Sequence, residues 1–139
     1  MKRSIVCLLL AVLMVIASVQ VGFAWELSGN PAVRFTYITN MNNAFSIVGS
    51  SAFCEGSIIA NAPSGMTVAL TVRLQRSSNG ISWTNIDVWT ATGKNQATVS
   101  GQKTLSTGYY YRTYVYGRVL DENGTRVESA VKYSSAKEY

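Results

Sequence analysis

The chain has 139 residues, of which 47% are hydrophobic and 14% charged, and its 12 basic and 7 acidic side chains give a formal net charge of +5. It contains no histidine, which excludes Ser-His-Asp and Cys-His nucleophilic sites and removes the commonest metal ligand. The basic residues are spread along the sequence, so the charge does not indicate a nucleic-acid-binding face.

Residues 1–24 are predicted to form a cleavable secretory signal, with the apolar helix typical of such segments. Lys2 and Arg3 precede an unbroken apolar run from Ile5 to Ala17, and a looser segment follows. A basic start, an apolar centre and a small-residue end are the three parts of a signal peptide. We therefore expect export, with an extracellular location and association with a cell surface as an alternative.

The cleavage site is expected between Ala24 and Trp25, because Gly22 and Ala24 are the small residues that signal peptidase requires. The alternative is a membrane anchor. A helix that spans the hydrocarbon needs about 20 apolar residues, and here Gln20 and Gly22 interrupt the run. Membrane contact is thus expected only through the signal before cleavage.

The rest of the chain is predicted to be one domain, residues 32–139, after a short lead over residues 25–31. Cys7 leaves with the signal, so Cys54 is the one cysteine of the mature chain and has no internal disulfide partner. An unpaired thiol can react or dimerise if exposed, but free cysteine is also among the most buried residue types. We expect Cys54 to be buried.

The first half of this domain alternates apolar and polar residues with the period of a β-strand and shows no helical spacing. Strands are expected at 33–38 and 44–48, with a bend over the polar link 39–43. A further strand is expected at 52–59, with Ala52, Cys54, Gly56 and Ile58 on its inner face. The clearest alternation runs from Met66 to Leu74.

Asn79-Gly80 follows this segment and predicts a hairpin with a two-residue type I′ turn, since both residues tolerate positive φ. The return arm is expected at 81–90. Trp83, Ile86 and Trp89 recur in it at every third residue, which indicates a β-bulge. The spacing does not decide which tryptophan is buried.

The second half continues with a turn at 93–95, a polar strand at 97–105, an aromatic strand at 109–120, a second Asn-Gly hairpin at 121–124 and a last strand at 127–133. Residues 134–139 are expected to fray. About seven strands at spacings near ten residues, joined by polar turns, are typical of an all-β antiparallel sandwich.

The order of several motifs also resembles a known group of proteins. The chain resembles small secreted immunoglobulin-like or fibronectin type III-like β-sandwich modules of Gram-positive bacteria, including a family with no assigned function. The resemblance lies in the order of Leu74-Gln75-Arg76, Trp83, Trp89, Gly108-Tyr109-Tyr110-Tyr111-Arg112 and a paired strand ending near Tyr133.

The resemblance implies an immunoglobulin-like or fibronectin type III-like architecture and no catalytic residues. It also implies a corner tyrosine at the start of the penultimate strand, at Tyr109 or Tyr111. The disulfide-linked subtype is excluded, because neither Tyr111 nor Thr113 gives Cys54 the partner that the subtype requires.

No constellation typical of catalysis or of a bound metal is found, and no cofactor is expected. Among the carboxylates only Asp121 and Glu122 are adjacent, inside a predicted turn where acidic residues are common. A Ser-x-x-Lys pattern begins at Ser100 and again at Ser134, but that motif works from a helix and these segments are a strand and a tail. The glycosylation pattern at Asn123 doubles as the hairpin turn.

The candidate binding site is the outer face of the aromatic strand. Alternation places Tyr109, Tyr111, Thr113, Val115, Gly117 and Val119 on the core side and leaves the other set facing outward: Tyr110, Arg112, Tyr114, Tyr116 and Arg118. Tyrosines beside arginines offer stacking surfaces and donors suited to sugars, phosphates or carboxylates. The alternative is that these side chains only cover the sheet through cross-strand pairs.

These observations favour a secreted, non-enzymatic β-sandwich that binds a cell-wall polymer, a carbohydrate or a surface protein. Two alternatives remain, namely a secreted antibacterial or toxin-like protein and a structural surface subunit that recruits another chain at an unpaired edge strand.

Overall fold

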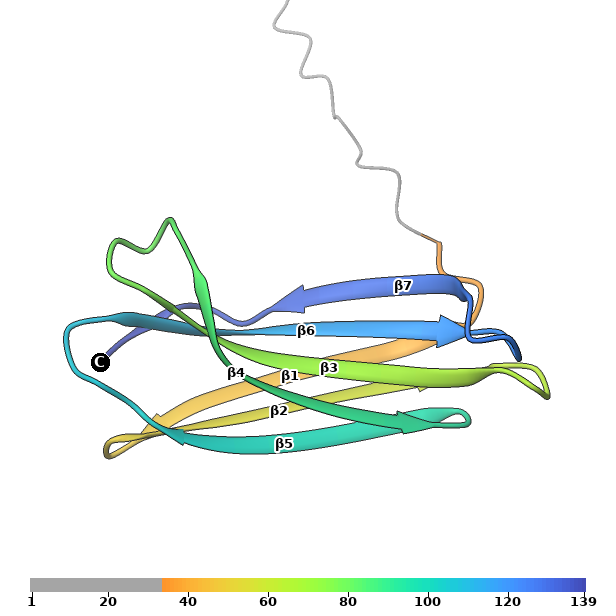
Figure 1. Ribbon diagram of the computed structural model, residues 1–139, viewed down its shortest axis with the longest axis horizontal. Helices are drawn as coiled ribbons and strands as arrows, with labels where there is room; N and C mark the ends of the chain where they lie inside the picture. Colours follow the sequence, from red (N-terminus) through yellow and green to blue (C-terminus); the bar gives the residue numbers. More distant parts are fainter. Residues whose placement is uncertain (1–33) are drawn as a thin grey trace, which may run out of the picture. The chain divides into compact units, whose positions relative to one another are not determined.

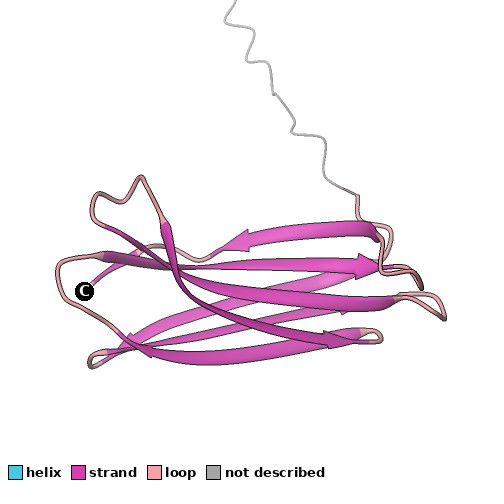
Figure 2. Ribbon diagram, in the orientation of Figure 1, coloured by secondary structure: helices cyan, strands magenta, loops and turns pink. Residues whose placement is uncertain are grey.

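The computed structural model describes residues 34–139, and every regular element in this part of the chain is a β-strand (Figure 2). The predicted signal peptide 1–24, its cleavage site at Ala24 and Trp25 and the lead 25–31 lie outside the described residues. The strands are β1 (Ile38–Val48), β2 (Ser51–Ala60), β3 (Thr67–Ser77), β4 (Thr84–Gly93), β5 (Gln96–Thr104), β6 (Tyr110–Leu120), β7 (Arg126–Tyr133) and β8 (Lys137–Glu138).

The strands form two antiparallel sheets that pack as a β-sandwich (Figure 1). One sheet has the order β1-β2-β5, and the other has the order β4-β3-β6-β7, with β8 paired to the beginning of β6. The chain changes sheet between β2 and β3, between β4 and β5, and again between β5 and β6. The predicted all-β antiparallel sandwich is confirmed.

The core consists of the inner faces that alternation predicted. In β2 the side chains of Ala52, Cys54 and Ile58 are buried, and in β6 the same is true of Tyr111, Val115 and Val119, together with Thr113. β3 lies between β4 and β6, and its inner residues Val68, Leu70, Val72 and Leu74 are fully buried. These three strands therefore supply most of the apolar area whose burial stabilises the sandwich.

The first strand differs from its prediction. Residues 34–37 are not in a strand, and the segment 39–43, expected to bend, belongs to the continuous strand β1. Backbone pairing with β2 overrides the weak strand preference of asparagine. The irregularity is limited to a register shift between Ile38 and Asn40.

The hairpin between β3 and β4 is confirmed, but its predicted type I′ turn is wrong. Gly80 has φ 72°, whereas no non-glycine residue of the described chain has a positive φ, so Asn79 is excluded from that turn conformation. Instead, Asn79 Oδ1 accepts hydrogen bonds from the backbone of Ile81 and Ser82, and Ser77 Oγ accepts one from Gly80. The side chains thus hold a longer loop, which ends at Trp83.

The bulge predicted in the return arm is present. Leu74 pairs with Asp87 and Gln75 pairs with Asn85, so Ile86 is the additional residue on β4. The register change separates the two tryptophans: Trp89 packs against the core, whereas Trp83 stacks on Arg112. The bulge therefore explains why the two indoles have different environments.

The C-terminal segment is ordered, contrary to the predicted fraying of 134–139. β7 ends opposite Tyr114, which leaves the beginning of β6 without a neighbour on that side. β8 pairs there with Tyr110 and Tyr111, and the backbone of Tyr139 exchanges hydrogen bonds with that of Tyr109. An edge that would otherwise lack partners is thereby completed.

One open side of the sandwich is closed by side chains that bridge β1 and β7. The Glu128 carboxylate accepts hydrogen bonds from the backbone N–H groups of Thr36, Tyr37 and Ile38. Burial favours the neutral acid, but these hydrogen bonds outweigh it and lower the pKa of Glu128. Lys132 Nζ donates to the carbonyl of Met41 on the same side.

The resemblance implied a corner tyrosine at Tyr109 or Tyr111, and Tyr111 has the matching contacts. Its ring is 1% exposed, and its hydroxyl donates to the carbonyl of Ser106 at 2.7 Å and accepts from the Ser106 N–H at 3.2 Å. The side chain thus fixes the loop that carries the chain from β5 to β6.

Cys54 is 2% exposed on the inner face of β2, as expected. Burial, with a smaller contribution from the negative charge of Asp87, raises the pKa of the thiol to about 12. We predict that a thiol reagent will label Cys54 slowly in the native protein and quickly in denaturant, because the reactive thiolate is both inaccessible and disfavoured. Mass spectrometry measures the rate of labelling, and fast labelling of the native protein would contradict the assignment of Cys54 to the core.

The raised pKa also links Cys54 to alkaline stability. Above the ordinary pKa of 9.0 the unfolded thiol loses its proton while the folded thiol keeps it up to about 12. The free energy of unfolding should then fall by up to about 1.4 kcal/mol per pH unit within this window because of Cys54 alone. Cys54→Ala should remove this part of the pH dependence in chemical unfolding experiments.

Candidate functional site

The outer face of the five-stranded sheet carries the side chains that the sequence singled out. The inner residues of β6 are buried, and the intervening residues Tyr110, Arg112, Tyr114, Tyr116 and Arg118 are all partly exposed. Strand register then adds side chains from neighbouring strands. Tyr114 lies between Arg73 of β3 and Tyr133 of β7, and Arg112 lies beside Gln75.

Arg112 is held most firmly of the residues on this face. Its guanidinium carbon lies 4.1 Å from the ring centroid of Trp83 and 4.5 Å from that of Tyr133, so the group is flanked by two aromatic rings. Its Nε donates to Gln75 Oε1 at 2.8 Å, and Gln75 Nε2 in turn donates to Asn85 at 2.9 Å. Cation-π stacking and this relay fix the orientation of the guanidinium plane.

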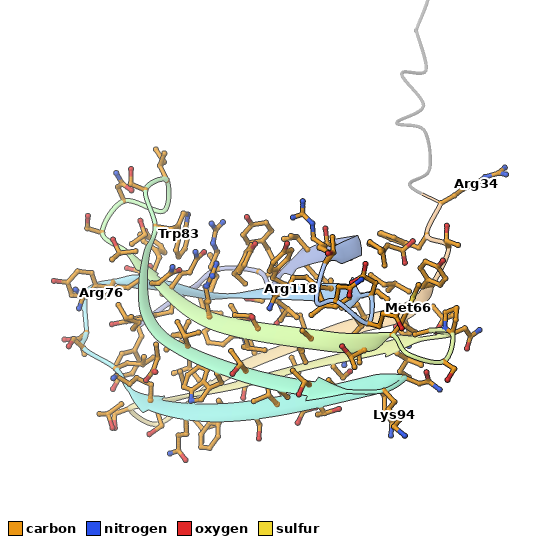
Figure 3. The ribbon with its side chains drawn as sticks, turned by 45° about the vertical axis from the view of Figure 1, so that its right-hand side comes forward. Arg34, Met66, Arg76, Trp83, Lys94 and Arg118 are labelled. Atoms are coloured by element: carbon orange, nitrogen blue, oxygen red, sulfur yellow. The ribbon has the colours of Figure 1, made fainter. Side chains whose placement is uncertain are left out.

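The contacts continue along the sheet as a series of rings and guanidinium groups. The Tyr114 ring lies 5.1 Å from that of Tyr133 and 6.3 Å from that of Tyr116, while the guanidinium of Arg73 lies 5.3 Å from the Tyr114 centroid. The guanidinium of Arg118 lies 5.3 Å from the Tyr116 centroid. Figure 3 shows Trp83 at the β3–β4 loop and Arg118 farther along the sheet.

Arg126 extends this series on β7. Its Nη1 donates to the Tyr116 hydroxyl at 3.0 Å, and this hydrogen bond is the main cause of the lowered pKa of Tyr116. We call the whole set the aromatic-arginine face and use the name for these residues only: Arg73, Trp83, Arg112, Tyr114, Tyr116, Arg118, Arg126 and Tyr133.

The aromatic-arginine face has an unbalanced charge. Within residues 34–139 the one salt bridge joins Lys103 Nζ to Asp87 at 3.2 Å, on β5 and β4. None of the four arginines of the face has a carboxylate at ion-pair distance in this part of the chain. Arg118 Nε is, in addition, buried without a hydrogen-bond partner among the described residues.

Four of the five predicted site residues belong to this face, and Tyr110 does not. Tyr110 lies at the start of β6, where its ring is beside the β3–β4 loop at Gly80 and its backbone pairs with Ser77 and Glu138. Sequence reasoning missed Arg73, Trp83, Arg126 and Tyr133. Identifying them requires the register between neighbouring strands, which the alternation within a single strand does not specify.

Two further observations concern the described residues as a whole. No helix among them is long and apolar enough to span a membrane. No group of three or more His, Cys, Asp or Glu side chains within 34–139 is arranged to hold a metal ion.

Comparison with known proteins adds little to this description. No protein-family model matches the chain, and no curated protein matches it. Among solved structures the chain is similar to a b-glucuronidase from Ruminococcus gnavus in complex with D-glucuronic acid, with a TM-score of 0.39 and 13% identity over 69% of this chain. The match spans 15% of the length of that enzyme, and a likeness at this level identifies neither a family nor an activity.

Proposed function

We propose that the protein is an exported, non-enzymatic binding module that attaches to a cell-wall or other extracellular surface through the aromatic-arginine face. The observation that carries the proposal is that four arginines share this face without a carboxylate partner within 34–139. Side chains that only cover a sheet commonly pair opposite charges across strands, because like charges placed close together are destabilising. Here Arg73, Arg112 and Arg118 stack on aromatic rings instead, and Arg126 donates to the Tyr116 hydroxyl.

The position of the face supports the same proposal. Its residues come from β3, β6 and β7 and from the end of the β3–β4 loop, so they are held by the rigid part of the sandwich. Tyr133 is 52% exposed. A ligand could therefore reach the rings and the guanidinium edges without any rearrangement of the core, which lowers the entropy lost on binding.

The experiment measures retention of the purified protein on cell-wall fractions. We predict that replacing both Arg112 and Tyr114 by Ala will abolish retention but shift the melting temperature only modestly, since surface changes away from the core have small effects on stability. The matched control is Thr98→Ala with Ser100→Ala, at exposed positions of β5 in the other sheet, which should leave retention unchanged. If the double variant of the face is retained like the parent, these side chains are only sheet cover.

A further inference from the structure

We propose that the ligand of the aromatic-arginine face is an acidic polysaccharide. This inference rests on the proposed function and names the chemistry of its ligand. In the proposed complex the anionic groups of the polymer accept hydrogen bonds from the guanidinium groups. The sugar rings of the polymer lie on the partly exposed tyrosine rings.

The charge of the face complements that of an anionic ligand. Arg73, Arg112, Arg118 and Arg126 contribute four positive charges, and within residues 34–139 none of them has a carboxylate at ion-pair distance. A face of one sign attracts ligands of the opposite sign and raises their local concentration. The complementary ligand is therefore anionic.

Contacts within the face hold the Arg112 side chain in place before any ligand binds. The Arg112 guanidinium carbon lies 4.1 Å from the Trp83 centroid and 4.5 Å from the Tyr133 centroid, and its Nε donates to Gln75. The Nη edge keeps its N–H donors, which is the geometry that binds a carboxylate or sulfate in a bidentate manner. Because the group is already ordered, less side-chain entropy is lost when an anion binds.

The length of the face favours a polymer over a small anion. Arg112 and Arg118 are six residues apart on β6, which corresponds to about 20 Å along a strand. A small anion would contact one of them at a time, whereas a polymer with repeated anions contacts several. Linked contacts of this kind increase the overall affinity because each one raises the effective concentration of the next.

The aromatic rings of the face favour a polysaccharide over other polyanions. Tyr114 and Tyr116 lie between Arg112 and Arg118 on the same face of the strand, and Tyr133 lies beside them with half of its surface exposed. Such rings combine an apolar body with a polar tip, so they suit a sugar, which has an apolar ring face and hydroxyl edges. Poly-glutamate carries the negative charges but has no sugar rings to lie on the tyrosines.

The test is calorimetric titration of the purified protein with polygalacturonate, with neutral dextran, poly-glutamate and single-stranded DNA as comparison polymers. We expect polygalacturonate to bind most tightly, and its affinity to fall at least about tenfold from low to physiological ionic strength, as exposed charges are screened. Equal affinity for dextran would overturn the requirement for an acidic ligand. Affinity for poly-glutamate equal to that for polygalacturonate would overturn the requirement for sugar, and equal affinity for DNA would overturn the preference for a polysaccharide over other polyanions.

Variants locate the interaction on the face. Arg112→Gln and Arg118→Gln should each weaken polygalacturonate binding about tenfold, and Arg112→Lys should weaken it nearly as much, because lysine keeps the charge but lacks the planar fork. Lys94→Gln, in the β4–β5 turn, removes one positive charge outside the face and serves as the control. It should bind polygalacturonate like the parent. An Arg112→Gln variant with an unchanged melting temperature and parental affinity would refute the proposal.

The two proposals fail differently. If polygalacturonate does not bind but the Arg112→Ala with Tyr114→Ala variant still loses retention on cell wall, the binding face stands and the acidic polysaccharide is wrong. If neither polygalacturonate binding nor wall retention depends on the face, both proposals are wrong.

Discussion

Replacing Tyr111 by Ala should lower the free energy of unfolding by about 3–5 kcal/mol, the range measured when large buried aromatic side chains are truncated. The ring is 1% exposed and belongs to the core cluster, so truncation removes buried apolar area and leaves a cavity that a closely packed interior fills only in part. Chemical unfolding monitored by tryptophan fluorescence measures the change.

Tyr111→Phe separates packing from the hydroxyl contacts. It keeps the ring but removes both hydrogen bonds to Ser106, so it should cost only about 1–2 kcal/mol. Tyr114→Ala, on the outer face of the same strand, is the matched surface control and should cost clearly less than Tyr111→Ala. Equal losses at Tyr111 and Tyr114 would contradict the assignment of the two faces of β6.

Replacing Gly101 by Ala should destabilise the protein by about 1–3 kcal/mol or more, although it adds a single methyl group. A Cβ atom at Gly101 would lie well inside van der Waals contact of three atoms of the Trp89 indole, Cδ2, Cε2 and Cζ2. The indole is rigid and packs against the core, so the two strands β4 and β5 would have to separate. Thermal unfolding measures the loss.

A double-mutant cycle tests whether the indole is the cause. Trp89→Ala alone should cost about 3–5 kcal/mol, but in its background Gly101→Ala should cost little, which corresponds to a coupling energy of about 1–3 kcal/mol. Ser100→Ala, at the neighbouring outward position of β5, is the control and should change stability by less than about 0.5 kcal/mol. Additive losses at Gly101 and Trp89 would show that the close contact does not limit this position.

The aromatic-arginine face illustrates how a site can be only half visible in a sequence. Alternation in β6 correctly separated Tyr111 and Val115 from Arg112, Tyr114 and Tyr116, because a strand must place successive side chains on opposite faces. The partners of these residues on neighbouring strands and loops lie 10 to 41 positions away in the sequence. Trp83 and Tyr133 meet on the two sides of Arg112 only because β3, β6 and β7 pair as they do.

The turns and the C-terminal segment could also be predicted only in part from the sequence. Asn-Gly pairs marked two hairpins, since glycine tolerates positive φ, and both hairpins are present. The form of the first turn was decided by hydrogen bonds of the Ser77 and Asn79 side chains, and the order of the C-terminal segment was decided by the free edge of β6. The hydrogen bonds of the turn are local, within residues 77–82, whereas the pairing of β8 joins segments far apart in the chain.

The sequence by itself determined that the described chain is built from strands, which residues of β2, β3 and β6 face inward, and where a bulge interrupts β4. These are local properties, fixed by the two-residue period of a strand and by residue chemistry. Only the tertiary structure decided the strand order, the continuity of β1, the contact of Trp89 with Gly101 and the environment of Arg112. These depend on pairing between residues far apart in the chain, and a one-dimensional pattern does not specify such pairing because many registers satisfy the same alternation.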